Sequence, residues 1–333
     1  MHISLTRRQL LAGAAGAAAS SAAPFAFAQA DWPRQPLRFV VPYAPGGVTD
    51  LTMRTVSKQV ADQMGQSIVI ENRAGAGGVA GVNTVAKAQP DGYTIGATAS
   101  STIIASPLLT PVPFDPAADL AFVSLLATVP MVLSVNTSLP IHSADDLLKY
   151  VSANKGKLNY GSTAVGHYGH VALLEVSDSL KAGMVHSPYK GESPLMQGIL
   201  GGELQFAFFA PSTVKPMADG GKLRMLGVSG TKRLKNLPDV PTLLEQGWTA
   251  PVFRMNPGWV GVVAPKKTPA SIVKRLSDEY ATAMRTPEIN DKIAGFGLDP
   301  VGGDGAEFFA TYQADRPVWA ELLKKAGLEV RGA

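Results

Sequence analysis

Two stretches of this sequence join a strand-like segment to a helix-like segment through glycine, and the first is "VVPYAPGGVTD", residues 40–50. The first-turn N–H groups of a helix have no acceptor within the helix and lie at the positive end of its dipole. This joint therefore favours an anion such as a carboxylate. Asp50 has two open interpretations, an acceptor for a ligand donor or a first-turn acid that complements the dipole. The candidate binding residues of this joint are Tyr43, Ala44, Gly46, Gly47 and Asp50.

The second joint, "YGSTAVGHYGH" at residues 160–170, repeats the pattern with small hydroxyl side chains and a glycine before a helix expected from about His167. Its candidate binding residues are Ser162, Thr163 and Gly166. The later "PYKGESP" adds Tyr189, which could equally be packed in a core, and Lys190, which could equally be a solvated surface lysine. Two such joints, one in each half of the chain, could close on one anion from both sides.

Two other patterns could carry cofactor chemistry, and both are weak. Gly75, Gly77 and Ala80 match the glycine spacing of a dinucleotide site, but the next strand ends "GATAS", without the acid that binds the ribose. Tight turning and close packing explain these glycines better. His167 and His170 have a spacing that can bind a metal on one helix face, but no acid accompanies them. We expect a hydrogen-bonding or structural pair there, and no cofactor and no metal.

The ends and the composition point to an exported globular protein of 333 residues with 46% hydrophobic and 17% charged residues. Residues 1–30 hold Arg7 and Arg8, a short apolar run and small residues, which is typical of a twin-arginine or general secretory signal cleaved near Ala28–Ala30. The alternative is an N-terminal anchor helix. We expect a periplasmic location, with no disulfide because the chain has no cysteine. Removal of the two arginines lowers the net charge from +4 to +2, which argues against nucleic-acid binding.

The elements that must position these residues alternate between strands and helices in two series, which predicts an α/β fold with largely parallel sheets. Pro130 interrupts a long apolar run and suits a crossing between two lobes, and "NPGWVGVVAP" reads as the strand that returns. We therefore expect one lobe from residues 31–130 plus 251–333 and another from 131–250, with the site in the cleft between them. Thr268 before Pro269 reads as the cap of a C-terminal helix.

Beyond these patterns, the sequence resembles the Bug-type extracytoplasmic solute receptors, the binding components of tripartite tricarboxylate transporters. The resemblance covers essentially all of the chain after the signal, in order. The matching stretches are "VVPYAPGGVTD", "VIENRAGAGGVAG", "PDGYTI", "NYGSTAVGHYGHVALLE", "PYKG", "GGELQFAF", "GGKLRMLGVSGTKR", "LPDVPTLLEQG" and "WVGVVAPKKTP".

The resemblance implies a fold like that of type II periplasmic binding proteins, with two lobes joined by two crossings. It implies that residues 43–47 and 162–166 hold a ligand carboxylate, with Asp50 and His170 at motif positions. Ser100, Ser101 and Thr102 match the loop after the third strand. His167 departs from the family pattern, in which a small hydroxyl residue is common at that position.

The function implied is capture without catalysis. A small organic carboxylate (a dicarboxylate, a tricarboxylate, an amino acid or an aromatic acid) would bind between the lobes of a monomer. The closed form would then be delivered to integral-membrane transporter subunits, or to a sensor protein instead. The aromatic residues Tyr43, Tyr189, Phe208 and Phe209 would suit an apolar-bodied acid. The alternative is a twin-arginine-exported periplasmic enzyme with a nucleotide or metal cofactor.

Overall fold

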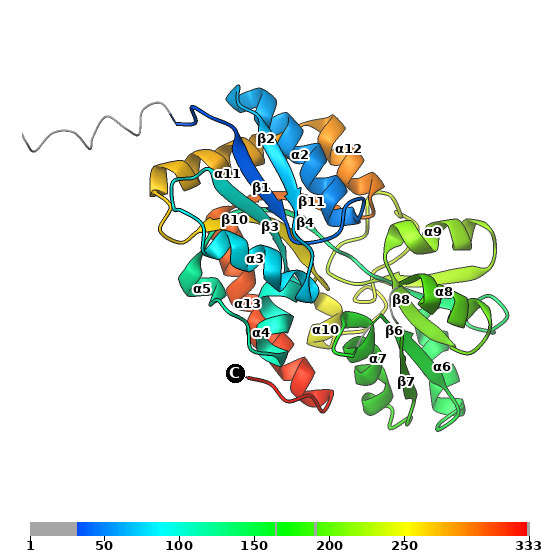
Figure 1. Ribbon diagram of the computed structural model, residues 1–333. Coiled ribbons are helices and arrows are strands. Elements are labelled where there is room, and N and C mark those ends of the chain that lie inside the picture. The colour runs from blue at the N-terminus through cyan, green and yellow to red at the C-terminus, as the bar shows by residue number, and fades with distance from the viewer. Residues whose placement is uncertain (1–31, 164, 190–191, 332–333) are drawn as a thin grey trace, which may run out of the picture.

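Two sheets, each covered by helices, form two lobes that lie side by side (Figure 1). The computed structural model describes residues 32–163, 165–189 and 192–331. The expected export signal at 1–30 and the candidate Lys190 therefore lie outside the described residues. Within the described ranges, no helix combines the length and the hydropathy that a membrane crossing requires.

The first lobe contains a six-stranded sheet in the order β11-β4-β10-β3-β1-β2. Strand β1 pairs in parallel with β2 and β3, whereas β10 runs antiparallel to β3 and β4, and β11 runs antiparallel to β4. Because helices cover both faces, the inner strands are continuous apolar runs with nearly every residue buried. The strands are β1 (Leu37–Val41), β2 (Ile68–Asn72), β3 (Thr94–Ala99), β4 (Leu120–Thr128), β10 (Trp259–Pro265) and β11 (Asp299–Asp304).

The helices of the first lobe come from both ends of the chain, and the long C-terminal helix α13 runs from this lobe toward the second (Figure 1). Asp304 caps α13, since its carboxylate accepts from the N–H groups of Ala306 and Glu307. The helices are α2 (Val48–Met64), α3 (Val79–Ala86), α4 (Ser106–Leu109), α5 (Pro116–Asp119), α11 (Ala270–Arg285), α12 (Pro287–Gly295) and α13 (Gly305–Lys325), with a 3-10 turn η1 (Ala76–Gly78) and a π-turn η2 (Ser101–Ala105).

The second lobe contains a five-stranded sheet in the order β7-β6-β8-β5-β9. Strand β6 pairs in parallel with β7 and β8, and β5 pairs antiparallel with β8 and β9. Its strands are β5 (Val132–Asn136), β6 (Asn159–Ser162), β7 (Val185–Pro188), β8 (Phe206–Phe209) and β9 (Leu223–Val228). Its helices are α6 (Ala144–Ala153), α7 (Tyr168–Ser179), α8 (Glu192–Leu200), α9 (Pro211–Asp219) and the short α10 (Pro251–Arg254), which lies next to α7.

Both expected crossings are present, and they lie against each other. The first crossing is the break at Pro130 between β4 and β5, and the second leads from β9 through α10 to β10. The N–H of Val129 donates to the carbonyl of Gly258 at 2.7 Å, and the N–H of Ser229 donates to that of Met131 at 2.9 Å. The two-lobed α/β fold is thus confirmed, whereas the lobe boundaries at 130/131 and 250/251 stay a prediction.

Two details differ from the expectation. Parallel pairs make up a smaller share of each sheet than expected, because the chain re-enters β5 and β10 antiparallel to their neighbours after crossing between lobes. Thr268 does not cap α11: Pro269 occupies the N-cap position, and the buried hydroxyl of Thr268 has no hydrogen-bond partner. The backbone N–H of Thr268 instead closes a turn onto the carbonyl of Pro265, which places the residue one position too early for a cap.

Candidate functional site: a cavity between the lobes

A cavity of about 180 Å³ lies where the two lobes meet the two crossings. Its polar lining comes from the loop after β3, with Ser100 and Ser101, and from the loop after β6, with Ser162, Thr163 and His167. Its apolar lining comes from the first crossing, from β8, from the start of β10 and from α13. Among the described residues, no Asp, Glu, Lys or Arg side chain lines it. The described lining therefore offers neutral dipoles to whatever binds here.

The second-lobe loop (residues 162–167, described except for 164) ends at the N-terminus of α7. Gly166 has φ of +81°, and its N–H donates to Nδ1 of His170 at 3.0 Å. His167 is the N-cap residue of α7, with extended backbone, and its Nδ1 lies 2.7 Å from the hydroxyl oxygen of Thr163. The loop thus directs a helix N-terminus and two polar side chains into the cavity.

The first-lobe loop (residues 43–47) has the same local geometry. Gly46 has φ of +80°, Gly47 is the extended N-cap residue of α2, and the N–H of Gly46 donates to the carboxylate of Asp50 at 2.9 Å. Asp50 therefore stands where His170 stands in the second lobe, four residues after the left-handed glycine. The two joints thus share one local construction, and the expectation that both belong to one site stays a prediction.

Asp50 is buried and fully engaged beneath its loop. It accepts from Gly46, from Arg54 at 2.9 Å and from the amide of Asn72 at 2.8 Å. Burial acts to raise the pKa of Asp50, but the hydrogen bonds from Arg54, Gly46 and Asn72 outweigh it and hold the pKa below its ordinary value. Its carboxylate therefore holds the first-lobe loop in place. This role differs from both interpretations of the sequence, an acceptor for a ligand donor and an acid that complements the helix dipole.

Two stacked histidine rings are hydrogen-bonded to the second-lobe loop. The rings of His170 and His186 are 3.9 Å apart between centroids, and Nε2 of His186 lies 2.7 Å from the hydroxyl of Ser162. Burial lowers the pKa of His170, and burial together with repulsion from His170 lowers that of His186 to about 4. Both rings are thus neutral near pH 7, as His170 must be for its Nδ1 to accept from Gly166.

This stack predicts a pH dependence of stability. The unfolded chain binds a proton at His186 near the ordinary pKa of 6.5, whereas the folded chain does so only near 4. The unfolded state therefore takes up more protons between these values, and stability is lost as the pH falls through this window. Denaturant unfolding from pH 7 to 4 should show the loss, and His186→Gln, which keeps a donor for Ser162, should flatten it. An equal slope in the variant would contradict the assignment to His186.

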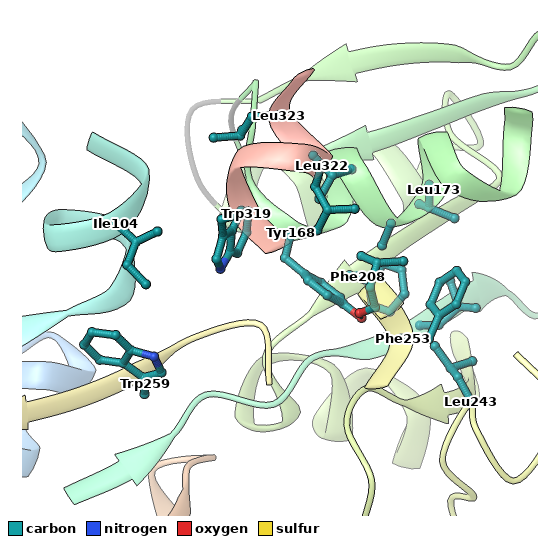
Figure 2. Packing of buried hydrophobic residues seen from close by; sticks show 14 of the residues in the cluster. Ile104, Tyr168, Leu173, Phe208, Leu243, Phe253, Trp259, Trp319, Leu322 and Leu323 are labelled. Atoms are coloured by element: carbon teal, nitrogen blue, oxygen red, sulfur yellow. The ribbon is translucent and has the colours of Figure 1, made fainter. Parts of the chain in front are cut away.

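Aromatic side chains from both lobes are among the residues that line the cavity. Figure 2 shows four of them, Tyr168, Phe208, Trp259 and Trp319, within the packed cluster. Trp259 begins β10, and its indole N–H donates to Asp315 at 2.8 Å, which fixes the orientation of the ring. Burial raises the pKa of Asp315 to about 6, despite the hydrogen bond from Trp259. Trp319 comes from α13, and Tyr168 packs edge-on against Phe208 with 5.1 Å between ring centroids. Each of these four aromatic side chains is buried, so packing sets its position in the wall.

The structure brings together part of the predicted site. Ser100, Ser101, Ser162, Thr163 and Gly166 line the cavity. The other described candidates do not line it, and their part in binding stays a prediction; they are Tyr43, Ala44, Gly46, Gly47, Asp50, His170 and Tyr189. The hydroxyl of Tyr43 lies 2.6 Å from that of Thr102, and the hydroxyl of Tyr189 donates to Glu203 at 3.0 Å. Of the four aromatics singled out in the sequence, Phe208 lines the cavity.

Sequence reasoning did not assign the cavity residues His167, Met131, Trp259 and Trp319 to the site. The sequence contained a signal for His167, because it directly follows Gly166 just as Gly47 directly follows Gly46. Trp259 and Trp319 gave no local signal, since an apolar residue in a strand or helix usually belongs to a core. Only the packing of α13 against both lobes brings Trp319 to this place.

The patterns that suggested cofactors have structural explanations. A Cβ on Gly81 would approach the Cα of Pro42 to 2.6 Å, and one on Gly78 would approach the hydroxyl of Thr102 equally closely. Gly75 and Gly77 have positive φ. The prediction of tight turning and close packing is confirmed for this segment. His167 and His170 use their Nδ1 atoms in separate hydrogen bonds, to Thr163 and Gly166, as expected of a hydrogen-bonding pair.

Comparison with known proteins decides the family. The model of the tripartite tricarboxylate transporter family receptor, TctC, matches residues 52–328. The chain belongs to the TctC family. Protein BugT of Bordetella pertussis is 32% identical over 99% of this chain and all of its own length.

Solved structures agree with this membership. The periplasmic binding protein BugD is 30% identical, with a TM-score of 0.70 over 90% of this chain and 99% of its own. A Rhodopseudomonas palustris protein solved with adipate is also 30% identical, with a TM-score of 0.74 over the same shares of the two chains. As a TctC-family protein, the chain is a solute-binding receptor of the periplasmic type, which confirms the expectation of a receptor and not an enzyme.

Proposed function

We propose that this TctC-family receptor captures a small organic carboxylate in the cavity between its lobes and delivers it to the membrane subunits of a tripartite tricarboxylate-type transporter. The observation that carries the proposal is the second-lobe loop. It brings the N-terminus of α7, the hydroxyls of Ser162 and Thr163 and the ring of His167 to one uncharged cavity. Adipate in the related R. palustris structure supports the same ligand class.

The receptor would hold the carboxylate by dipoles. The N–H groups of Tyr168 and Gly169 belong to the first turn of α7, where helical acceptors are lacking, and both residues line the cavity. Partial desolvation lowers the pKa of His167, so that its ring is neutral near pH 7. With the Thr163 hydroxyl donating to Nδ1, Nε2–H would be a further donor for the ligand.

Closure would follow from differential affinity for two arrangements of the lobes. In the closed arrangement the ligand contacts Ser100 and Ser101 of the first lobe and the second-lobe loop at the same time. The ligand therefore binds the closed arrangement more tightly than the open one and favours it. The first-lobe loop, whose residues 44–47 are exposed, would join the ligand on closure. The membrane subunits would then recognise the closed form.

A thermal-shift panel tests the proposal on residues 32–333. It would hold dicarboxylates, tricarboxylates, amino acids and aromatic acids, with the neutral amide of each acid and nucleotide cofactors as controls. A carboxylate at 100 times its Kd should add about 2.7 kcal/mol of stability, a rise of several degrees in Tm. The amides and nucleotides should give no shift. A shift with nucleotides alone, or with none of the acids, would overturn the proposal.

Thr163→Val should then weaken the carboxylate that binds. The variant keeps the shape of the side chain and removes the hydroxyl that donates to Nδ1 of His167 and thereby keeps the ring proton on Nε2. One such hydrogen bond is worth about 0.5–1.5 kcal/mol, so Kd should rise about 2- to 12-fold by calorimetry. Thr137→Val, which removes a hydroxyl that donates to Gly221 away from the cavity, is the matched control and should bind like the wild type. Equal affinity in Thr163→Val and the wild type would contradict the role of this hydroxyl in setting the Nε2–H donor of His167.

A further inference from the structure

His167 lies where the cavity meets the N-terminus of α7. It is the N-cap residue of that helix, it is exposed, and it lines the cavity. Its Nδ1 lies 2.7 Å from the hydroxyl oxygen of Thr163, and this is the one hydrogen bond of the ring within the described residues. Nε2 is therefore available to a group that enters the cavity.

The other titratable groups near the cavity are engaged or do not line it. Of the described lining residues only Tyr168 can also titrate, and its hydroxyl donates to the carbonyl of Val252 at 3.0 Å. The stacked rings of His170 and His186 do not line the cavity. Neither do the charged side chains of α7 and α13, which are Glu175, Asp178, Glu307, Asp315, Arg316, Glu321, Lys324 and Lys325.

Histidine differs from the other basic side chains in its response to an anion near neutral pH. A lysine or an arginine beside a carboxylate would already be charged and would take up no proton, whereas a neutral imidazole can take one up. His167 is thus the described group that is placed to exchange a proton when a carboxylate binds.

A bound carboxylate opposes the effect that keeps this ring neutral. Desolvation lowers the pKa of His167, because the surrounding protein disfavours the charged ring. A carboxylate within hydrogen-bond distance of Nε2 favours the charged ring, and a full opposite charge so close raises a pKa by about 1 to 3. The pKa of His167 is therefore higher in the complex than in the free protein, and binding draws a proton from the solvent.

The hydrogen bond to Thr163 accommodates this proton. In the neutral ring that donates through Nε2–H, Nδ1 has a lone pair and accepts from the Thr163 hydroxyl. The proton from the solvent binds Nδ1, and the hydroxyl turns to accept from Nδ1–H, so no hydrogen bond is lost. The charged ring then donates to the carboxylate through Nε2–H, which is a stronger hydrogen bond than the neutral ring makes.

We propose that His167 couples capture of the carboxylate to the uptake of one proton, so that the receptor binds more tightly as the pH falls from 8 to 6. This inference rests on the proposed function, because it assigns a regulation by pH to the same site. A carboxylate stays ionised over most of this range, so the pH dependence reports on the ring. The affinity should rise about 3- to 50-fold from pH 8 to pH 6.

Calorimetry tests the coupling with adipate, malate, citrate, glutamate and benzoate as probes. The tightest-binding probe is titrated at pH 7 in buffers of different ionisation enthalpy, and the change of the heat with the buffer gives the number of protons taken up. The wild type should take up about 0.2 to 0.9 proton for each molecule bound. Its Kd for the same probe is then measured at pH 8, 7 and 6.

Two variants assign the proton to a residue. His167→Gln has an amide donor near the position of Nε2 and does not titrate, so its proton uptake should be lower than that of the wild type by the amount that His167 contributes. The difference between the two proteins cancels any proton that the acid itself takes up. His142→Gln is the matched control, because His142 is exposed and does not line the cavity. It should keep the proton uptake of the wild type.

The outcomes separate this inference from the proposed function. A wild-type Kd that does not change with pH, or equal proton uptake in the wild type and His167→Gln, would overturn the coupling and leave the carboxylate receptor standing. Binding of none of the five acids would overturn both.

A second measurement applies if His167→Gln does not bind. The ring proton resonance of His167, assigned by its absence from the variant, should titrate at higher pH with the probe than without it. An unchanged midpoint would overturn the coupling.

Discussion

Replacing Asp50 with alanine should lower the free energy of unfolding by about 2–3 kcal/mol, one of the two largest effects we expect. Asp50 is 1% exposed, and its carboxylate accepts from three donors, Gly46, Arg54 and Asn72. Its loss leaves the N–H of Gly46 without its acceptor and the amide of Asn72 with the carbonyl of Tyr43 alone, and the first-lobe loop loses its support. Guanidinium unfolding followed by circular dichroism measures the change.

Asp145→Ala is the matched control for this prediction. Asp145 is also a first-turn acid with a basic partner four residues on, Lys149, but both side chains of that pair are well exposed. If Asp50 only complemented the helix dipole, the two variants would lose similar amounts, about 0.3–1 kcal/mol. The buried network predicts a clearly larger loss for Asp50→Ala, and equal losses would contradict it.

Replacing Gly166 with alanine should lower both stability and carboxylate affinity. At φ of +81° an L-residue costs about 1–2 kcal/mol, and the added Cβ would lie 3.1 Å from Leu323 and 3.2 Å from Leu328. The Cδ atoms of both leucines can yield by a few tenths of an ångström, so we expect the strain at the left-handed φ to shift the second-lobe loop, and with it Thr163 and the start of α7. We expect Kd to rise at least about tenfold, since small displacements of a binding loop lose several oriented hydrogen bonds.

Gly156→Ala separates strain from site geometry. Gly156 has φ of +71°, lies in the same lobe and has no atom within 4 Å of an added Cβ. This variant should show the backbone strain, about 1–2 kcal/mol, with unchanged affinity in calorimetric titration. A Gly166→Ala protein that binds as tightly as Gly156→Ala would show that the second-lobe loop does not contact the ligand.

The strand, glycine and helix order of both joints could be predicted from the sequence because it depends on neighbouring residues. Left-handed backbone needs glycine, a helix start leaves N–H groups without acceptors, and both signals are local. The two joints also share a less obvious feature, the equivalent positions of Asp50 and His170. Each follows its left-handed glycine by four residues and accepts from its N–H group. The sequence contains this spacing, but an aspartate and a histidine at equivalent positions do not suggest the same structural role.

The cavity wall could not be predicted in the same way. Trp259 and Trp319 are far from Thr163 along the chain, and they meet it only because β10 returns to the first lobe and α13 reaches the second. Their sequence surroundings are those of ordinary buried residues. Thr268 shows the reverse problem, since a favourable local cap signal was outweighed by a turn onto Pro265. Long-range packing therefore decides both the aromatic character of the site and this helix start.

The central claim is that a carboxylate binds between the lobes and draws them together. Because the chain has no cysteine, spin labels can be placed at Lys58→Cys on α2 and Ser152→Cys on α6, both exposed and in different lobes. Electron–electron distance measurement should give a shorter and narrower distribution when the best-binding carboxylate of the panel saturates the protein, and no change with its neutral amide. An unchanged distribution in a sample that calorimetry shows to be saturated would contradict the claim.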